Sequence, residues 1–290
     1  MSFSLVLTQS NVVSSSNNSI YQYNFLGGNF QMKDNEICIT QATIPYSFFN
    51  VNGANGNTIN LTFPFATPVV ANLSLTTGFY TVSDINLFFQ NYCVANKYYM
   101  IVTTTGQFVY FLAFFTNTTF YQNQVVFTAL PTAAEAVTLG WTIPVGATWT
   151  LPAASANMTM AFASTGSIAP LLGFVPGTSY SPTAGAGGSS TSILSPNVPI
   201  GSFVNSIIMR SNLINNNVGN PTDILDSMPI ANATFGANIN YSPSFPKWTK
   251  VADGTYSQFN ISLFNELLQP IVAQDNRVLI NLLIRKIGAV

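Results

Sequence analysis

The stretch Glu36-Ile37-Cys38-Ile39-Thr40-Gln41-Ala42-Thr43-Ile44, which is followed by Pro45, decides the fold. Its β-branched residues and the alternation of apolar and polar side chains are typical of a strand. The run Thr58–Phe63 alternates in the same way. Further strands are expected at Val69–Leu75, Tyr98–Thr104, Gln107–Phe115, Gln124–Thr128, Met158–Ala163, Ser202–Met209, Ala237–Tyr241, Tyr256–Leu263 and Arg277–Arg285. Short strands separated by Gly, Pro and Asn predict an all-β sandwich or barrel.

One segment departs from this alternation and favours a short amphipathic helix from about Ser83 to Ala95. Ser83 can cap the helix, and Asp84 is favourable at the positive end of the helix dipole. The apolar side chains of one helical face are Ile85, Phe88, Phe89 and Tyr92. We expect this aromatic stripe to pack on a sheet rather than to bind a cofactor.

Composition narrows the range of functions. Only 6% of the 290 residues are charged, where about a quarter is usual, and 48% are hydrophobic, so a sizeable core can form. The chain contains no histidine. Sites that need an imidazole are therefore excluded, which include Ser-His-Asp and Cys-His nucleophile pairs and His-ligated zinc or haem.

Charge and hydropathy argue against two classes of partner. The chain has 8 basic and 9 acidic residues, whereas nucleic-acid binders usually carry a clustered basic face, so we expect no direct nucleic-acid binding. The longest purely apolar run, Phe108–Phe115, is far shorter than the roughly 20 residues of a spanning helix, so we expect no membrane span. Met1–Asn11 lacks the basic region of a signal peptide, and no export is expected.

We expect residues 1–290 to form a single domain. An insertion is expected around residues 129–155, which are rich in Ala, Pro and Thr. A flexible loop is expected around residues 178–192, which include Gly185-Ala186-Gly187-Gly188. This loop could also divide two domains. We prefer a loop within one domain, because the segments on both sides of it have strand patterns.

A few residues could offer nucleophilic chemistry. Ser244-Phe245-Pro246-Lys247 fits the S-x-x-K pattern, in which a lysine one helical turn away activates a serine. Pro246 disfavours that helix, and the companion Ser-Asp-Asn and Lys-Thr-Gly motifs do not occur in the sequence, so we expect a turn that leads into a strand. Cys38 and Cys93 could pair, but two cysteines in so long a chain are more often buried free thiols.

Two close acidic pairs, Asp34 with Glu36 and Asp223 with Asp226, could supply a general acid/base pair or a calcium site. Asp34 and Glu36 precede an apolar strand, which favours a solvated strand end. Asp223 and Asp226 follow a Gly-Asn-Pro-Thr sequence, which favours roles in a turn and a helix cap. We therefore expect no catalytic, cofactor-binding or metal-binding residue, and no cofactor.

Several phrases of the sequence resemble one family, the single jelly-roll penton or minor capsid proteins of virophages, polinton-like viruses and related large DNA viruses. The first phrases are Asn29–Glu36, Ile44-Pro45-Tyr46-Ser47-Phe48-Phe49-Asn50 and Gly78-Phe79-Tyr80-Thr81-Val82-Ser83-Asp84-Ile85-Asn86. The later ones are Pro170-Leu171-Leu172-Gly173-Phe174, Ser211-Asn212-Leu213-Ile214 and the closing run Phe259–Arg285. Their order covers most of the chain.

This resemblance implies a single jelly-roll β-sandwich and a structural, non-enzymatic role. The implied role is a homopentamer at the five-fold vertices of an icosahedral capsid, in contact with a double jelly-roll major capsid protein. The implied location is the virion, after synthesis in the host cell. Eight strands of about five to six residues need far fewer than 290 residues, so long loops or an inserted lobe must be present.

Two other functions stay open at this stage. A carbohydrate-binding β-sandwich, lectin-like or a viral attachment domain, would need exposed aromatic side chains such as Trp141 and Trp149 beside a polar groove. An enzyme would have to assemble its site from the scattered carboxylates.

Overall fold

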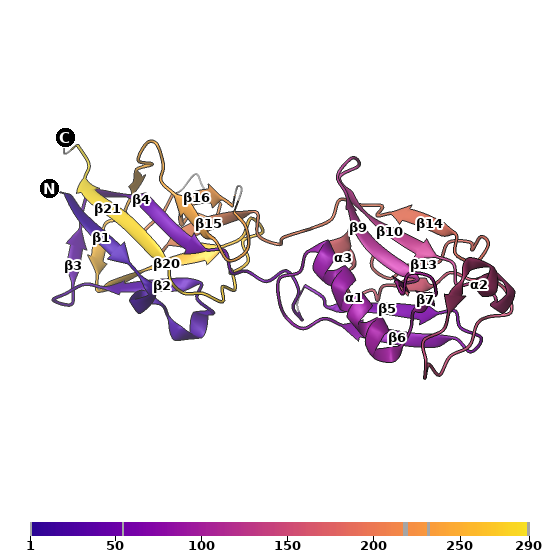
Figure 1. Ribbon diagram of the computed structural model, residues 1–290. Coiled ribbons are helices and arrows are strands. Elements are labelled where there is room, and N and C mark those ends of the chain that lie inside the picture. Colours follow the sequence, from indigo (N-terminus) through magenta and orange to yellow (C-terminus); the bar gives the residue numbers. More distant parts are fainter. Residues whose placement is uncertain (1, 54, 217–219, 231–232, 289–290) are drawn as a thin grey trace. The chain divides into compact units, whose positions relative to one another are not determined.

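The computed structural model describes residues 2–53, 55–216, 220–230 and 233–288. The chain divides into two compact units. Unit 1 consists of residues 1–49 and 203–290, and unit 2 consists of residues 50–202. Strands predominate in both units (Figure 1). Within the described residues, no helix is long and apolar enough to cross a membrane.

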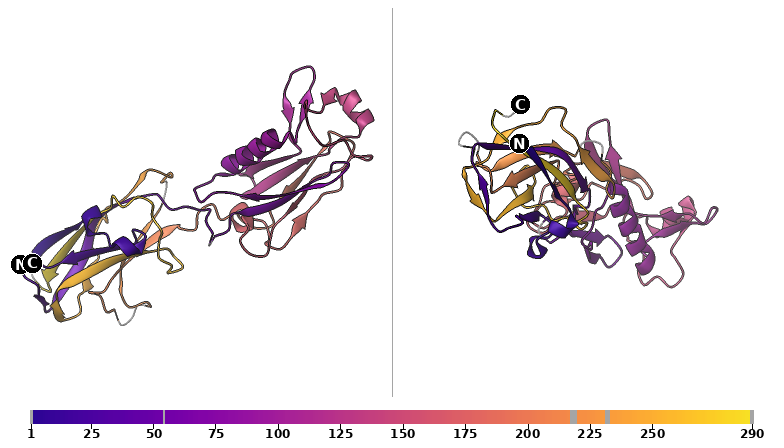
Figure 2. Two further views of the ribbon diagram at one scale, coloured as in Figure 1. Left: turned by 90° about the horizontal axis from the view of Figure 1, so that it is seen from below. Right: turned by 90° about the vertical axis from the view of Figure 1, so that its left-hand side faces the viewer.

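Unit 1 is a jelly roll of two antiparallel sheets (Figures 1 and 2). The first sheet has the order β1-β21-β4-β17 and consists of β1 (Ser2–Leu7), β21 (Leu279–Lys286), β4 (Asn35–Pro45) and β17 (Asn238–Tyr241). The second has the order β16-β15-β20-β2 and consists of β16 (Ile224–Pro229), β15 (Ser206–Ser211), β20 (Gln258–Phe264) and β2 (Ile20–Asn24). This order of eight strands confirms the expected single jelly roll.

Short elements complete unit 1. Strand β18 (Thr249–Lys250) adds to β4, and β19 (Gly254–Tyr256) pairs with β3 (Phe30–Met32). Two 3₁₀ helices, Gln9–Asn11 and Ser14–Ser16, lie between β1 and β2. The inner face of each sheet is set by alternation, as in β20, where Phe259, Ile261 and Leu263 are buried, and in β21, where Ile280, Leu282 and Ile284 are buried.

Unit 2 is inserted into the connection between β4 and β15. In the β4–β21 register Asn35 pairs with Lys286 near the chain's end, so the other end of β4, at Pro45, lies away from both termini. The chain therefore leaves the jelly roll at the end opposite the termini. The sequence predicts a single domain with an insertion around residues 129–155, whereas the inserted unit is longer and contains those residues.

Three sheets and three helices make up the described residues of unit 2. The first sheet has the order β13-β12-β5-β6, with β13 (Ser179–Tyr180), β12 (Thr159–Ala161), β5 (Thr58–Phe63) and β6 (Val69–Ser74). The second has the order β14-β10-β9, with β14 (Ser190–Leu194), β10 (Gln122–Thr128) and β9 (Leu112–Asn117). The third has the order β11-β7-β8, with β11 (Trp141–Thr142), β7 (Met100–Val102) and β8 (Phe108–Val109). The helices are α1 (Val82–Asn96), α2 (Ala133–Leu139) and α3 (Ala169–Leu172). Large aromatic side chains fill the core between them, namely Phe63, Phe89, Phe111, Phe127 and Phe174.

Helix α1 confirms the predicted helix, with one change at its start. Thr81 rather than Ser83 is the N-cap: its side chain accepts a hydrogen bond from the N–H of Asp84, and the Asp84 carboxylate accepts one from the Thr81 N–H. The cap lies two residues earlier because Asp84 supplies the second half of this capping box. Ile85, Phe89 and Cys93 form the buried face.

Two features of unit 2 differ from the sequence-based expectation. Helix α2 lies inside the expected insertion and α3 follows it, so the chain has more than the one helix predicted. The expected loop 178–192 contains β13 and the start of β14. Both helices are too short to show a helical period in the sequence.

Candidate functional site

The acidic pair Asp34 and Glu36 does not form a site. The Glu36 carboxylate pairs with the Arg285 guanidinium at 2.6 Å, across the register of β4 and β21. The Arg285 guanidinium also lies 3.8 Å from the ring centroid of Trp248, which fixes it on the sheet. Asp34 occupies the turn before β4 with a φ of 51°. Glu36 therefore forms an ordinary ion pair that links strands β4 and β21.

The second acidic pair is divided between two cations. Asp223 pairs with Arg210 at 2.7 Å. Asp226 is buried and accepts hydrogen bonds from Lys247 Nζ and from the Tyr241 hydroxyl, each at 2.7 Å. The bond to Asp226 raises the pKa of Lys247, and burial, followed by the bond to Asp226, raises the pKa of Tyr241. Through these two hydrogen bonds, Asp226 attaches β17 and the segment that follows it to strand β16. Asp226 therefore does not act together with Asp223. The helix-cap role expected for this pair is wrong, because both residues lie at or in strand β16.

The S-x-x-K sequence is not a catalytic motif in this fold. Residues 242–248 have no helix, and Lys247 is bound to Asp226 instead of Ser244. Cys38 and Cys93 are both free and buried, the first in unit 1 and the second in unit 2. In the described ranges, no group of three or more His, Cys, Asp and Glu side chains could hold a metal ion.

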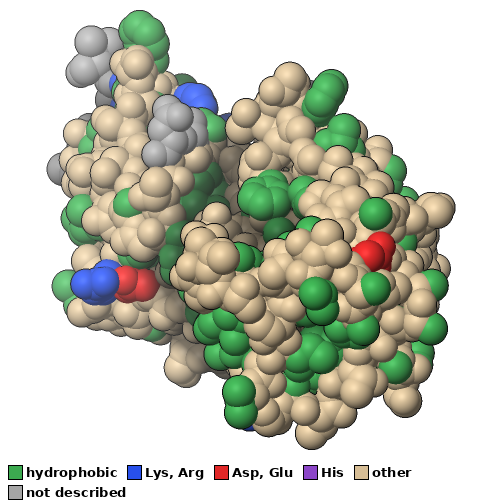
Figure 3. Space-filling view, turned by 45° about the vertical axis from the view of Figure 1, so that its right-hand side comes forward, with side chains coloured by type: hydrophobic (Ala, Val, Ile, Leu, Met, Phe, Trp, Pro, Cys, Tyr) green, Lys and Arg blue, Asp and Glu red, His purple; other side chains and the backbone are tan. Residues whose placement is uncertain are grey.

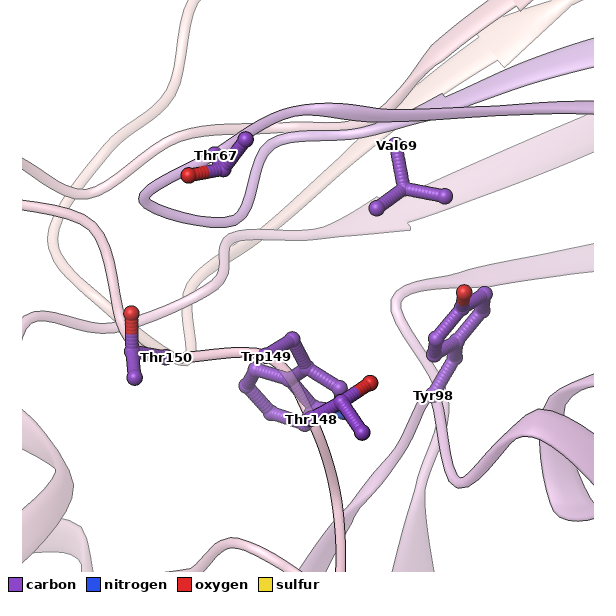
Figure 4. Close-up of a pocket in the computed structure, with 6 residues that line it drawn as sticks. All are labelled: Thr67, Val69, Tyr98, Thr148, Trp149 and Thr150. Carbon is purple, nitrogen blue, oxygen red and sulfur yellow. The ribbon is translucent and has the colours of Figure 1, made fainter.

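The tryptophans do not form the exposed platform that a carbohydrate site was expected to use. Trp149 is only 6% exposed, its ring stacks on Phe65 with centroids 4.3 Å apart, and its Nε1 donates to the Lys97 carbonyl oxygen at 2.7 Å. Trp141 is half-buried in β11. The edge of Trp149 lines a cavity of about 210 Å³ together with Thr67, Val69, Tyr98, Thr148 and Thr150 (Figure 4).

The few charged side chains of unit 2 are engaged within the unit itself. Asp84 and Glu135 complete the capping boxes of α1 and α2, and Lys97 Nζ donates to the carbonyl oxygens of Val145 and Gly146 at 3.0 and 3.2 Å. These are the only charged residues between positions 50 and 202. The outer surface of unit 2 is therefore nearly free of charge.

Glu135 joins the two segments that the sequence marked as an insertion and a loop. Its carboxylate accepts hydrogen bonds from Thr132 N and Oγ1, from Ser155 Oγ at 2.5 Å and from Gly187 N at 2.9 Å. These bonds, with that of Ser155 the largest contribution, lower the pKa of Glu135 to about 2. The segments around residues 132, 155 and 187 are thus bound to one carboxylate.

Several large apolar side chains are exposed on the surface of unit 2. Two adjacent aromatic residues at the β9–β10 turn, Phe120 and Tyr121, are 61% and 76% exposed, and Val145 is 95% exposed. On the face shown in Figure 3, Lys, Arg, Asp and Glu side chains are few and hydrophobic side chains form several patches. Such a surface can be covered by another molecule without the desolvation of many ions.

Unit 1 has a polar pocket that the sequence pattern does not predict. It is lined by residues of β15 and β20 and by Asp223, which lies just before β16, and it has a volume of about 170 Å³. Of its lining residues, the sequence indicates only Asp223 as a candidate, because the residues of β15 and β20 are distant in sequence.

Comparison with known proteins gives structural neighbours only. No family model matches the sequence, and no curated protein matches it. The fold is similar to the crystal structure of the mavirus penton protein, with a TM-score of 0.46, 10% identity, and 99% of each chain covered. It is also similar to a chain of the Sputnik virophage structure from cryo-electron microscopy, with a TM-score of 0.40, 10% identity, and coverage of 99% of this chain and 97% of that chain.

Proposed function

We propose that this chain is a structural capsid protein, the penton, which forms a homopentamer at the five-fold vertices of an icosahedral virion. Its neighbour in the shell would be a double jelly-roll major capsid protein. The observation that carries the proposal is the eight-stranded jelly roll of unit 1, a fold used by capsid proteins, in a chain whose sequence phrases resemble penton proteins.

The residues that carry the resemblance have a common structural role. Asn50 belongs to the phrase Ile44–Asn50, and Tyr80 belongs to the phrase Gly78–Asn86. Asn50 Nδ2 donates to the Tyr80 carbonyl oxygen at 2.8 Å, and Asn50 Oδ1 accepts from the Tyr80 N–H at 2.8 Å. Asn50 Nδ2 also donates to the Gly201 carbonyl oxygen at 3.0 Å. The two ends of the insertion are thereby held together, so these phrases specify the architecture of the chain rather than a chemical site.

The phrase Pro170–Phe174 has a similar role. Gly173 ends α3 with a φ of 79°, and a Cβ at this position would lie 2.4 Å from the Asn197 carbonyl oxygen. The Ile200 N–H donates to the Pro170 carbonyl oxygen at 3.0 Å. The phrase therefore packs against and binds the segment around Asn197 and Ile200, through which the chain returns from unit 2 to the jelly roll.

The surface composition supports assembly from many copies. A ring closes through heterologous contacts, so each copy must present two different complementary patches. A buried ion without a partner costs several kcal/mol, and a surface of Asn, Thr, Ser and exposed apolar side chains avoids that cost. Ring formation is thus consistent with the nearly uncharged exterior of unit 2.

Native mass spectrometry and electron microscopy of the purified full-length chain test this proposal. We expect a species of five times 31.3 kDa with five-fold class averages, either alone or after mixing with a double jelly-roll shell protein. Shells assembled from that protein alone are the control and should have empty vertices. A chain that stays monomeric at all concentrations and is absent from mixed shells would refute the penton role.

A further inference from the structure

Two Asn-Gly sequences, Asn52-Gly53 and Asn55-Gly56, follow each other closely at the start of unit 2. An Asn that precedes Gly can lose its side-chain amide, because glycine has no Cβ to hinder attack by its backbone nitrogen on the side-chain carbonyl carbon. The reaction needs no other group of the protein. Since the two sequences are chemically alike, the structure around each glycine decides which of them reacts.

Gly56 is held in place and covered. Its N–H donates to the Asn52 carbonyl oxygen at 2.9 Å, and the next N–H, of Asn57, donates to the Gly166 carbonyl oxygen at 2.9 Å. Gly56 is buried, and a Cβ at this position would lie 2.2 Å from the Ser167 carbonyl oxygen. The Gly56 nitrogen can therefore attack the preceding side chain only after its hydrogen bond breaks and the backbone moves away from Ser167.

Gly53 has none of these restraints. It is exposed, a Cβ at this position would meet nothing within 4 Å, and its N–H donates to no acceptor among the described residues. When Asn52 turns towards the reactive geometry, the backbone bond at risk is the one that its carbonyl oxygen accepts from Gly56. Reaction at Asn55 would break that same bond and would also displace Gly56 from its packing. The barrier is therefore lower at Asn52.

The side chain of Asn52 is already polarised for attack. Its Oδ1 accepts a hydrogen bond from the Asn55 N–H at 2.7 Å. Negative charge develops on this oxygen when a nucleophile adds to Cγ, and an N–H that already points at the oxygen stabilises that charge. The turn that follows Asn52 thus assists the reaction at this residue.

We propose that Asn52 is a site of spontaneous deamidation in the folded protein and that Asn55 is protected. The Gly53 nitrogen forms a bond to Asn52 Cγ, and the Cγ–Nδ2 bond breaks as ammonia leaves with the proton of the Gly53 N–H. Water then opens the resulting succinimide ring at either of its two carbonyl carbons, which gives aspartate or isoaspartate. The only co-reactant is water.

The product changes the charge of unit 2. Asp84, Lys97 and Glu135 are the only charged residues between positions 50 and 202, and the new carboxylate at position 52 is a fourth. It lies close in sequence to Asn50, whose side chain holds the two ends of the unit together. Isoaspartate also inserts the Cβ methylene into the backbone at this place. The inference goes beyond the capsid role and does not rest on it.

Peptide mass spectrometry of the full-length chain tests the proposal. The purified protein is kept at mildly alkaline pH, digested at acidic pH to suppress further reaction, and fragmented so that Asn52 and Asn55 are read separately. We expect Asn52 to deamidate at least about tenfold faster than Asn55, which corresponds to about 1.4 kcal/mol in the barrier. In urea the two residues should react at similar rates, because the unfolded chain no longer holds Gly56.

Variants connect the reaction to the Gly53 nitrogen. Gly53→Ala should slow deamidation of Asn52 at least about tenfold, because the methyl group hinders attack, and should keep the fold, because the methyl group meets no neighbour. Gly201→Ala, at a glycine with equally open surroundings but no preceding Asn, is the matched control and should react as the wild type does. Three results would overturn the proposal: no product at Asn52 while the unfolded chain reacts, a rate ratio of Asn52 to Asn55 below about tenfold in the folded protein, or an unchanged rate in Gly53→Ala.

Discussion

Unit 1 carries fourteen of the seventeen charged residues of the chain, whereas unit 2, the longer of the two, carries three. In unit 1 eight of these fourteen residues form four ion pairs, and all of the ion pairs found among the described residues lie there. In unit 2 the charges bind backbone groups and hydroxyls. Asp84 and Glu135 complete the N-terminal capping boxes of α1 and α2, and Lys97 Nζ binds the carbonyl oxygens of Val145 and Gly146.

This difference shows two ways to stabilise a β-rich unit. The jelly roll joins strands that are far apart in sequence, and ion pairs such as Arg285 with Glu36 lie across those strand pairs. Unit 2 instead depends on an aromatic core and on polar caps of its short elements. Its outer surface is left with neutral polar and apolar side chains, which suits contacts that must not desolvate ions.

The largest expected effects test whether each unit depends on its own core. Phe127→Ala in unit 2 and Phe259→Ala in unit 1 each remove a fully buried ring and should cost about 3–5 kcal/mol. Hydrogen exchange measured peptide by peptide should show faster exchange in residues 50–202 for the first variant and in the jelly roll for the second. Phe115→Ala, which removes a half-exposed ring, is the control. Equal loosening of both units by either variant would show that they unfold as one.

Two glycines of unit 2 allow the cost of a left-handed backbone to be compared with the cost of a steric clash. Gly173 and Gly106 both have a positive φ, of 79° and 72°, but a Cβ at Gly173 would strike the Asn197 carbonyl oxygen, whereas a Cβ at Gly106 would meet nothing within 4 Å. Gly106→Ala should cost about 1 kcal/mol, from the left-handed backbone alone, and Gly173→Ala about 3 kcal/mol. Urea unfolding measures both. Equal losses would mean that the chain moves away from Gly173 at no cost.

The regular alternation of the sequence predicted most of the strands, because period two is a local signal. Strands β5 and β10 and helix α1 lie within two residues of their expected bounds. Strand β2 was missed because Tyr21 is its only buried residue, so its alternation is weak. The fold class was thus accessible from local pattern and from the resemblance.

The division into units and the polar contacts could not be predicted in this way. The chain enters and leaves unit 2 at Phe49-Asn50 and Ser202-Phe203, which have no linker composition, while the glycine-rich run is bound to Glu135 inside the unit. Glu36 meets Arg285 across 249 positions of sequence. Asn260 and Arg210 likewise come together only through the pairing of β15 with β20, so no spacing could reveal their pocket.

A smaller effect is expected at the buried carboxylate of unit 1. Asp226→Ala removes the acceptor of both the Tyr241 hydroxyl and Lys247, and should cost about 2 kcal/mol. Asp226→Asn keeps an acceptor and should cost less. Thermal unfolding compares them, with Asp253→Asn as a control carboxylate of the same unit. If Asp226→Ala changed hydrogen exchange in residues 50–202, the carboxylate would stabilise more than unit 1.

The smallest effect is the acid dependence of unit 2, which contains only two carboxylates. Hydrogen bonds from Thr81 lower the pKa of Asp84, and those from Ser155 and Gly187 lower the pKa of Glu135 to about 2 from an ordinary value of 4.5. Both groups therefore stabilise the folded unit above their unfolded pKa, and this stabilisation is lost as the pH falls from about 5 towards 2. Hydrogen exchange of residues 50–202 across that range should show the loss in the wild type.

Variants of the two carboxylates test whether Asp84 and Glu135 cause the acid dependence of unit 2. Glu135→Gln should be less stable than the wild type at pH 7, by less than Gly173→Ala, and the two proteins should converge only as the pH falls below about 2, where the wild-type carboxylate becomes protonated in the folded state as well. The double variant Asp84→Asn/Glu135→Gln should remove nearly all of the slope. Glu266→Gln, a change in unit 1, should leave the slope of unit 2 as it is. A double variant that kept the wild-type slope would show that the acid response of unit 2 comes from the charges of unit 1, and the two units would then not respond to acid separately.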